Sequence, residues 1–145
     1  MPRLFLALKL VLDTQIWLDW LVFDDPAVRP LRNAVHLGRA QIVIDAACDA
    51  ELERVLAYDL GKHSISPQAQ LAALDQARRL AHRVEVVALK GLPQCRDPDD
   101  QKFIQLAAAT NADALVTKDR ELLRLKRQLP FRVVRLEELS ISGSR

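Results

Sequence analysis

Short apolar runs alternate with longer amphipathic stretches along this chain of 145 residues. The apolar runs are continuous instead of alternating with polar residues, which is typical of strands in a parallel sheet covered by helices on both faces. The stretches between them carry apolar residues at helical spacing and begin at capping residues. We therefore predict an α/β fold of three α/β/α layers around a mostly parallel sheet of about five strands. The strands are predicted at residues 8–12, 41–45, 84–89, 114–117 and 131–136.

Helical segments fill the intervals between these strands. Ser66 can cap a helix that has Pro67 in its first turn, and Gly61 ends the helix before it. Leu71, Leu74, Ala77 and Ala81 form the predicted apolar face of the helix that begins at Ser66. The other helices are predicted at residues 15–23, 26–38, 46–58, 98–110 and 120–126.

Composition places the chain among compact globular proteins. Half of the residues are hydrophobic, 28% are charged, and the formal net charge is +2, so disorder and a polyelectrolyte tail are both excluded. We expect one domain over residues 1–139 and a short flexible tail over residues 140–145. Cys48 and Cys95 are far apart and form no CxxC motif, which argues against a disulfide scaffold or a zinc site. Lys9 interrupts the apolar N-terminal stretch, so we expect no membrane span and a cytoplasmic location.

Acidic residues follow the predicted strands at the edge where ligands bind in open parallel sheets. Asp13 follows the first strand, Asp97 to Asp100 follow the third after a loop, and Asp119 follows the fourth. Glu51 lies deeper in a helix and reaches this edge only if that helix leans across it. Clustered carboxylates repel one another unless a cation neutralises them. Oxygen ligands alone favour Mg²⁺ or Mn²⁺, ions that act chiefly on phosphates.

Each acid also has a purely structural interpretation. Asp97 and Asp119 are suited to capping the helices that follow them, and Glu51 can pair with Arg54 on a helix face. Asp13 is the strongest single candidate, because a carboxylate at the end of a buried strand requires a compensating partner. Three histidines lack a convincing nucleophile partner and are expected at the surface: His36, His63 and His82.

Three blocks of the sequence resemble the PIN-domain nucleases, specifically toxin components of bacterial toxin–antitoxin modules. These blocks are VLDTQIWLDW, IVIDAACDAELERVL and RDPDDQKFIQLAAATNADALVTKDREL. The resemblance implies four acids that hold the metal and catalyse: Asp13, Glu51, Asp100 and Asp119. It implies supporting roles at the same edge for Thr14, Thr117 and, as an outer acid or a helix cap, Asp97. Two positions depart from the family pattern: Gln15 replaces the usual Asn, and Asp45 replaces a frequent Ser.

The function implied by the resemblance is a metal-dependent endoribonuclease that leaves a 5′-phosphate and a 3′-hydroxyl. Asp13, Asp100 and Asp119 would hold the metal, and Glu51 would hold a second ion or orient the water. Candidate contacts to RNA phosphates are the basic residues near the predicted cleft: Lys102, Lys118, Arg120 and Arg124. A cognate antitoxin and a second copy of the chain are the expected protein partners, the dimer through an apolar ridge that includes Trp17 and Trp20.

Other functional classes fit less well. A haloacid-dehalogenase-like phosphatase needs a second Asp two residues after the first, where this chain has Gln15. A phospho-receiver domain shares a Thr-Lys pair, Thr117-Lys118, but not the long helical insertion over residues 46–83. The remaining alternative is a catalytically weak or inactive PIN domain that binds RNA or proteins as a scaffold.

Overall fold

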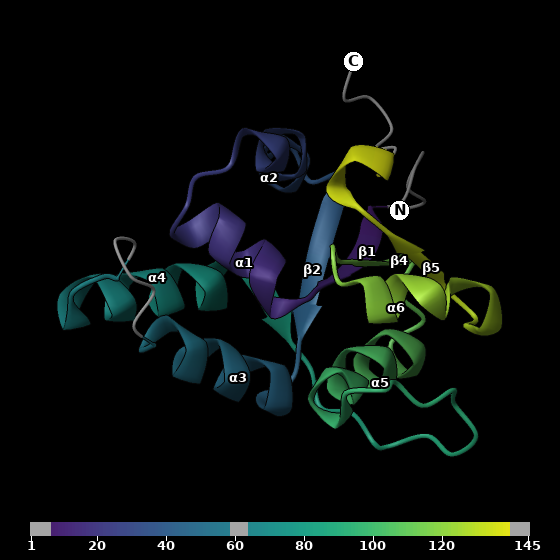
Figure 1. The fold of residues 1–145 in the computed structure, drawn as a ribbon. Helices are drawn as coiled ribbons and strands as arrows, with labels where there is room; N and C mark the ends of the chain where they lie inside the picture. The colour runs from purple at the N-terminus through teal and green to yellow at the C-terminus, as the bar shows by residue number, and fades with distance from the viewer. Residues whose placement is uncertain (1–6, 59–63, 140–145) are drawn as a thin grey trace.

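The computed structural model describes residues 7–58 and 64–139. Five parallel strands form one sheet in the order β3-β2-β1-β4-β5 (Figure 1). This confirms the predicted α/β class and the parallel arrangement. The strands are β1 (Leu8–Leu12), β2 (Ala40–Ile44), β3 (Ala81–Arg83), β4 (Ala114–Val116) and β5 (Arg132–Val134).

Helices connect the strands and begin at side-chain caps where the sequence offers them. Ser66 caps the helix that has Pro67 in its first turn, as predicted, by accepting a hydrogen bond from the amide of Ala69. The α-helices are α1 (Thr14–Leu21), α2 (Arg29–His36), α3 (Ala46–Leu56), α4 (Pro67–Leu80), α5 (Gln101–Ala109) and α6 (Arg120–Arg124). Short 3-10 turns are η1 (Pro26–Val28), η3 (Pro98–Asp100), η4 (Lys126–Gln128) and η5 (Leu136–Glu138).

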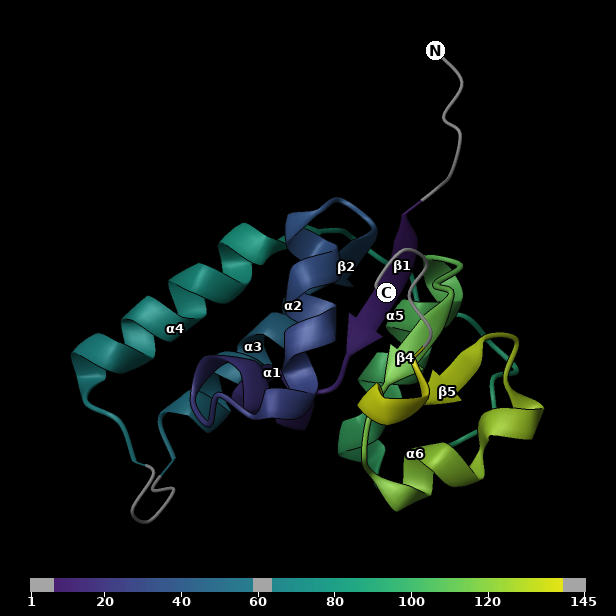
Figure 2. The same cartoon turned by 90° about the horizontal axis from the view of Figure 1, so that it is seen from above.

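The helices cover the two faces of the sheet unequally. Helices α1 to α4 lie on one side, while α5 and α6 lie on the other (Figure 2). Successive strand residues point to opposite faces: Leu10 and Leu12 of β1 join the core beneath α1 to α4. Val11, between them, packs in the core with Phe103 of α5 and Leu122 of α6. The three predicted layers are therefore present, with a buried sheet between two apolar cores.

The prediction of a strand over residues 84–89 is wrong. The third strand comes earlier, at Ala81–Arg83, directly after α4. The amide of Val84 still bonds to the carbonyl of Ile44 at 2.9 Å. Beyond Ile44 the chain of β2 turns into α3 and offers no further partner. The apolar run therefore leaves the sheet, and Val87 is 82% exposed.

Two expectations about apolar surfaces are also corrected. Leu71 does not face the core with Leu74, because it is 68% exposed, whereas Leu74 is buried. Trp17 and Trp20 stack on each other with ring centroids 5.9 Å apart and are buried in the core on the α1 face. They offer no surface ridge to a second copy of the chain, so the argument for a dimer loses that support.

Some predictions concern residues outside the described ranges: the helix end at Gly61, the surface position of His63 and the tail over residues 140–145. Among the described residues, no helix combines the length and apolarity needed to cross a membrane.

Candidate active site

The pairing of β1 with β4 builds the centre of the candidate site. Leu12 is paired with Val116, so the next residues of the two strands, Asp13 and Thr117, lie side by side. The Thr117 hydroxyl donates a hydrogen bond to Asp13 Oδ2 and accepts one from the Asp119 amide at 2.9 Å. This fully buried threonine thus holds both acids at the carboxyl edge of the sheet.

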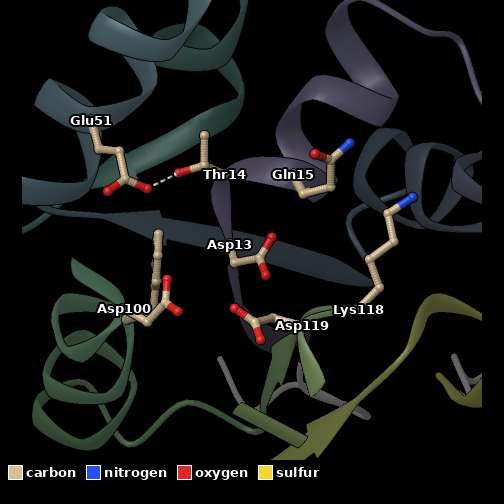
Figure 3. Close-up of a pocket in the computed structure, with 8 residues that line it drawn as sticks. Asp13, Thr14, Gln15, Glu51, Asp100, Lys118 and Asp119 are labelled. Atoms are coloured by element: carbon tan, nitrogen blue, oxygen red, sulfur yellow. Dashed lines mark hydrogen bonds between the residues drawn. The ribbon is translucent and has the colours of Figure 1, made fainter. Parts of the chain in front are cut away.

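Asp100 comes to the same edge from the other side of the sheet. It ends the 3-10 turn η3 and precedes α5, and it lines one pocket with Asp13 and Asp119 (Figure 3). The volume of the pocket is about 440 Å³. Three aspartates from three separate segments therefore share one cavity. The other residues that line it are Thr14, Gln15, Glu51, Phe103 and Lys118.

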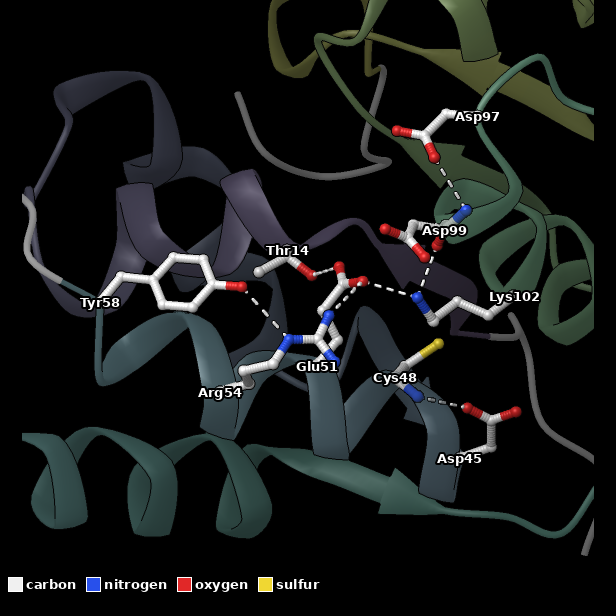
Figure 4. Close-up of polar contacts among 9 residues, drawn as sticks. All are labelled: Thr14, Asp45, Cys48, Glu51, Arg54, Tyr58, Asp97, Asp99 and Lys102. Carbon is white, nitrogen blue, oxygen red and sulfur yellow. Dashed lines mark hydrogen bonds and ion pairs between the residues drawn. The ribbon is translucent and has the colours of Figure 1, made fainter.

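Glu51 reaches the pocket because α3 packs beside α1 and α5. Its Oε2 accepts a hydrogen bond from the Thr14 hydroxyl at 2.5 Å, and its Oε1 lies 2.6 Å from the Lys102 ammonium (Figure 4). Arg54 lies 3.6 Å from the same Oε1 atom. The predicted ion pair between Glu51 and Arg54 is present, but its distance is the longest of these three contacts of the Glu51 carboxylate. Glu51 is a buried acid whose charge is already balanced by neighbouring cations.

Two of the acids have raised pKa values. Burial raises the pKa of Asp13 from 3.8 to about 6, opposed by the hydrogen bond from Thr117. Burial also raises the pKa of Asp100 to about 7, together with a hydrogen bond to Asp119 and the negative charges of Asp119, Asp97 and Asp13. Both shifts mean that negative charge is costly in this pocket, first because the carboxyls are buried and then because neighbouring carboxylates repel one another.

Helix capping and pocket lining coincide in two of the acids. Asp13 Oδ1 accepts a hydrogen bond from the Ile16 amide at 3.2 Å, at the start of α1. Asp119 Oδ1 accepts from the Glu121 amide at 2.8 Å, at the start of α6. The predicted capping role of Asp119 is correct, and the cap at Asp13 is an additional finding. Neither cap competes with a role in the pocket.

Asp97 and Asp45 are helix caps that do not line the pocket. Asp97 is exposed and accepts from the Asp99 amide at 2.9 Å, although its charge still contributes to the raised pKa of Asp100. Asp45 accepts from the Cys48 amide at 3.0 Å and caps α3. Burial, with the Asp45 charge next, raises the pKa of the Cys48 thiol well above its usual range, which is typical of a structural buried cysteine.

The four basic candidates differ in how freely they can meet a phosphate. Lys102 is 20% exposed and is engaged with Glu51 and with the carbonyl of Asp99 at 2.5 Å. Lys118 lines the pocket and is 44% exposed. Arg124 pairs with Glu121 at 3.4 Å on α6, and Arg120 is exposed at the start of the same helix. Lys118 is therefore the candidate best placed beside the acids.

Asp19, a buried acid of α1, is a further residue beside the pocket that was not predicted from the sequence. Its carboxylate contacts two residues that line the pocket: the Gln15 amide at 3.1 Å and the Lys118 ammonium at 2.7 Å. The sequence did contain a signal for the contact with Gln15. Asp19 follows Gln15 by four residues in a mostly apolar helix, and side chains at this spacing meet on one face of a helix. Its partner Lys118 could not be read from spacing, because it comes from the segment after β4.

The donor set fits a hard divalent cation. Asp13, Asp100 and Asp119 supply only oxygen ligands, and the raised pKa values of two of them describe a pocket in which a cation would relieve repulsion. The ligands are not drawn together in advance: within residues 7–58 and 64–139, no three His, Cys, Asp or Glu side chains form a ready-made metal site.

The fold and this pocket define a three-layer α/β protein with an acidic cavity at the carboxyl edge of a parallel sheet. Comparison with known proteins agrees. The sequence matches the PIN domain family over residues 9–121, which include all four predicted acids. The chain belongs to this family, whose members are nucleases and generally depend on divalent metal ions.

A solved structure supports the fold independently. The chain is similar to a chain in the crystal structure of VapBC2 from Rickettsia felis bound to a DNA fragment from their promoter. The identity is 18%, the alignment covers 88% of this chain and 97% of that chain, and the TM-score is 0.60. No curated protein matches the sequence. At this identity the similarity concerns the fold alone.

Proposed function

We propose that this protein is a Mg²⁺- or Mn²⁺-dependent endoribonuclease and the toxin of a toxin–antitoxin module. The observation that carries the proposal is the convergence of three aspartates on one pocket, two of them with raised pKa values. Membership of a nuclease family supports hydrolysis of a phosphodiester. Similarity to a chain of VapBC2, a toxin–antitoxin complex, supports an antitoxin partner.

In this proposal Asp13, Asp100 and Asp119 hold the metal, which when bound would activate water and stabilise the leaving oxygen. Thr117 keeps the Asp13 carboxylate and the Asp119 backbone in place. Glu51 orients the attacking water or holds a second ion. Its contacts favour the first role, because Lys102 and Arg54 already balance its charge.

The proposal is tested by incubating the wild type and Asp100→Asn with mixed RNA in Mn²⁺, Mg²⁺ or a chelator. Wild type should cut only with metal, and Asp100→Asn should lose about 100-fold or more of the rate, because a ligand is removed. Asp99→Asn is the matched control: its side chain is the exposed neighbour of Asp100 and lies outside the pocket lining. It should cut like the wild type.

Thermal melting distinguishes failure of the chemistry from failure of the site. Metal should raise the melting temperature of the wild type and of Asp99→Asn, but not of Asp100→Asn. If metal stabilises none of them and none cuts, the metal-dependent nuclease is refuted. Metal-independent RNA binding without cleavage would instead favour the scaffold alternative.

The antitoxin partner and the homodimer have separate tests. Co-expression with the product of the adjacent gene should give a stable complex that does not cut RNA. The homodimer no longer has the tryptophan ridge as support, because both rings are buried. Light scattering at micromolar concentration tests it: twice the mass of the chain would establish the dimer, and a monomer would contradict it.

A further inference from the structure

Asp19 is a buried carboxylate that has no part in the metal site proposed above. It is 3% exposed on α1, in a helix whose other buried side chains are mostly apolar. Removing a carboxylate from water is unfavourable unless its oxygens find strong partners. Oδ1 accepts a hydrogen bond from the Gln15 amide, and Oδ2 is 2.7 Å from the Lys118 ammonium.

Both partners of Asp19 line the acidic pocket. Figure 3 shows Gln15 and Lys118 on the same side of it, with the ammonium turned toward Gln15 and away from Asp119. Through Asp19, one turn of α1 therefore holds the Gln15 side-chain amide and the Lys118 ammonium at the rim of the pocket.

The contact with Asp19 leaves Lys118 able to bind a second anion. An ammonium has three N–H donors, and Asp19 engages one of them through Oδ2. The side chain remains 44% exposed. A free lysine loses much rotamer freedom when it binds a ligand, whereas one already held loses less, so its position is prepared in advance.

We propose that Asp19 is a positioning residue that fixes the Lys118 ammonium at the pocket rim, where it contacts a backbone phosphate of the RNA beside the scissile one. The inference rests on the proposed function and extends it by naming the chain's own phosphate clamp. Gln15 completes the clamp by holding the second oxygen of Asp19.

The phosphate contact is tested by binding, without metal and without cleavage. A fluorescent single-stranded RNA of mixed sequence is titrated with Asp100→Asn protein in chelator at several salt concentrations. Adding Lys118→Met should weaken binding about threefold to tenfold and lower the slope of log Kd against log salt by about 0.7, the value for one contact to a single strand. An unchanged affinity and slope overturns the contact.

The positioning role is tested by a double-mutant cycle over Asp19→Asn and Lys118→Met. With metal and saturating RNA, Asp19→Asn should lower the cleavage rate about tenfold. KM should change little, because a less ordered Lys118 weakens RNA binding while the removal of a negative charge strengthens it. In protein that already carries Lys118→Met, Asp19→Asn should cause no further loss of cleavage rate. Lys118→Arg should retain most of the rate. An equal loss from Asp19→Asn in both backgrounds shows that Asp19 acts only through the fold.

A matched control separates positioning from stability. Asp49 is another buried aspartate paired with basic residues, Arg78 at 2.7 Å and Arg83 at 3.4 Å, and it does not line the pocket. Asp49→Asn should lower the melting temperature and leave Kd and the cleavage rate unchanged.

The results also separate this inference from the proposed function. If wild type cuts RNA but Lys118→Met does not alter binding, only the clamp is wrong. If the wild type does not cut RNA, the double-mutant cycle is measured on the Kd for RNA. The effect of Asp19→Asn on Kd must then depend on the presence of Lys118, and additive effects overturn the positioning role. If Asp100→Asn protein binds no RNA, both the clamp and the RNA substrate are refuted.

Discussion

Asp13 shows how one side chain can serve both the fold and the site. One of its oxygens accepts the Ile16 amide and begins α1, while the other accepts the Thr117 hydroxyl. Asp119 combines the same two duties at the start of α6. A cap restricts the rotamers of its side chain, so these acids are held near the pocket before any ligand arrives. Capping is thus part of how the site is built.

The raised pKa values predict an unusual pH dependence of stability. The folded pKa values of Asp13 and Asp100, about 6 and about 7, lie above the usual 3.8. Their contribution to stability is complete below about pH 4 and is lost as the pH rises through 6 to 7. In chelator, the wild-type melting temperature should therefore fall between pH 5 and pH 8. Asp100→Asn should fall less and melt above the wild type at pH 8. Thermal melting across this range is the measurement, and equal slopes for both proteins would contradict it.

At the scale of elements, an ion pair between Glu51 and Lys102 connects α3 to α5 beside the pocket. Lys102 and Glu51 contribute side chains that are 20% and 11% exposed, so neither is freely solvated. Arg54, at 3.6 Å from the same carboxylate, is 56% exposed and is largely solvated. Burial, and not the number of contacts, decides which of these pairs holds the two helices in register.

We predict that Lys102→Met destabilises the protein by about 1–3 kcal/mol, because it leaves the buried Glu51 carboxylate without its nearest cation. Arg54→Met should cost much less than Lys102→Met, because the Arg54 side chain is largely solvated. Adding Glu51→Gln to Lys102→Met should recover part of the loss. Urea unfolding of the wild type, Lys102→Met, Glu51→Gln and the double variant measures the coupling between the two side chains. Additive losses would show that the pair does not connect the helices.

Helix α4 shows where periodicity alone misleads. Leu71 and Leu74 are three residues apart and were both predicted to face inward, but of these two leucines only Leu74 is buried. The helix begins near Ser66 and its first turns extend past the sheet, as Figure 2 shows. Apolar spacing identifies a helix and its face, but not how much of its length finds a partner.

The two leucines give a direct test of this interpretation. Leu74→Ala should destabilise by about 2–4 kcal/mol through lost burial and a cavity, whereas Leu71→Ala should change stability by no more than about 0.5 kcal/mol. Chemical unfolding of both variants checks the difference. A large loss at Leu71 would mean that this leucine is covered in solution, for instance by a second copy of the chain.

At the scale of the whole molecule, the site depends on strand order. Asp13 and Thr117 are 104 residues apart in the chain and become neighbours because β4 pairs with β1. The crossover through α5 and β4 also brings Asp100 and Asp119 to the same edge. No local segment contains the pocket, so it exists only when the central strands of the sheet are assembled.

Thr117→Val tests this long-range connection. The Thr117 hydrogen bond lowers the pKa of Asp13, so its loss should raise that pKa and move the pH midpoint of metal binding upward, since the ligand must be deprotonated. The readout is the rise in melting temperature caused by Mn²⁺ between pH 5 and pH 8. Thr117→Ser retains the hydroxyl and should behave like the wild type. A midpoint that does not move for Thr117→Val contradicts the role of the hydroxyl.

The sequence by itself determined the α/β class, the parallel sheet and the acids at the strand ends, because these follow from continuous apolar runs and from caps only one or two residues away. Strand β3 was misplaced, since the apolar run after Arg83 has the composition of a strand but no strand beside it. Only the tertiary structure decided that Lys102 neutralises Glu51 and that Asp19 holds Lys118. Such contacts join segments distant in sequence, and their strength depends on burial, which no local pattern encodes.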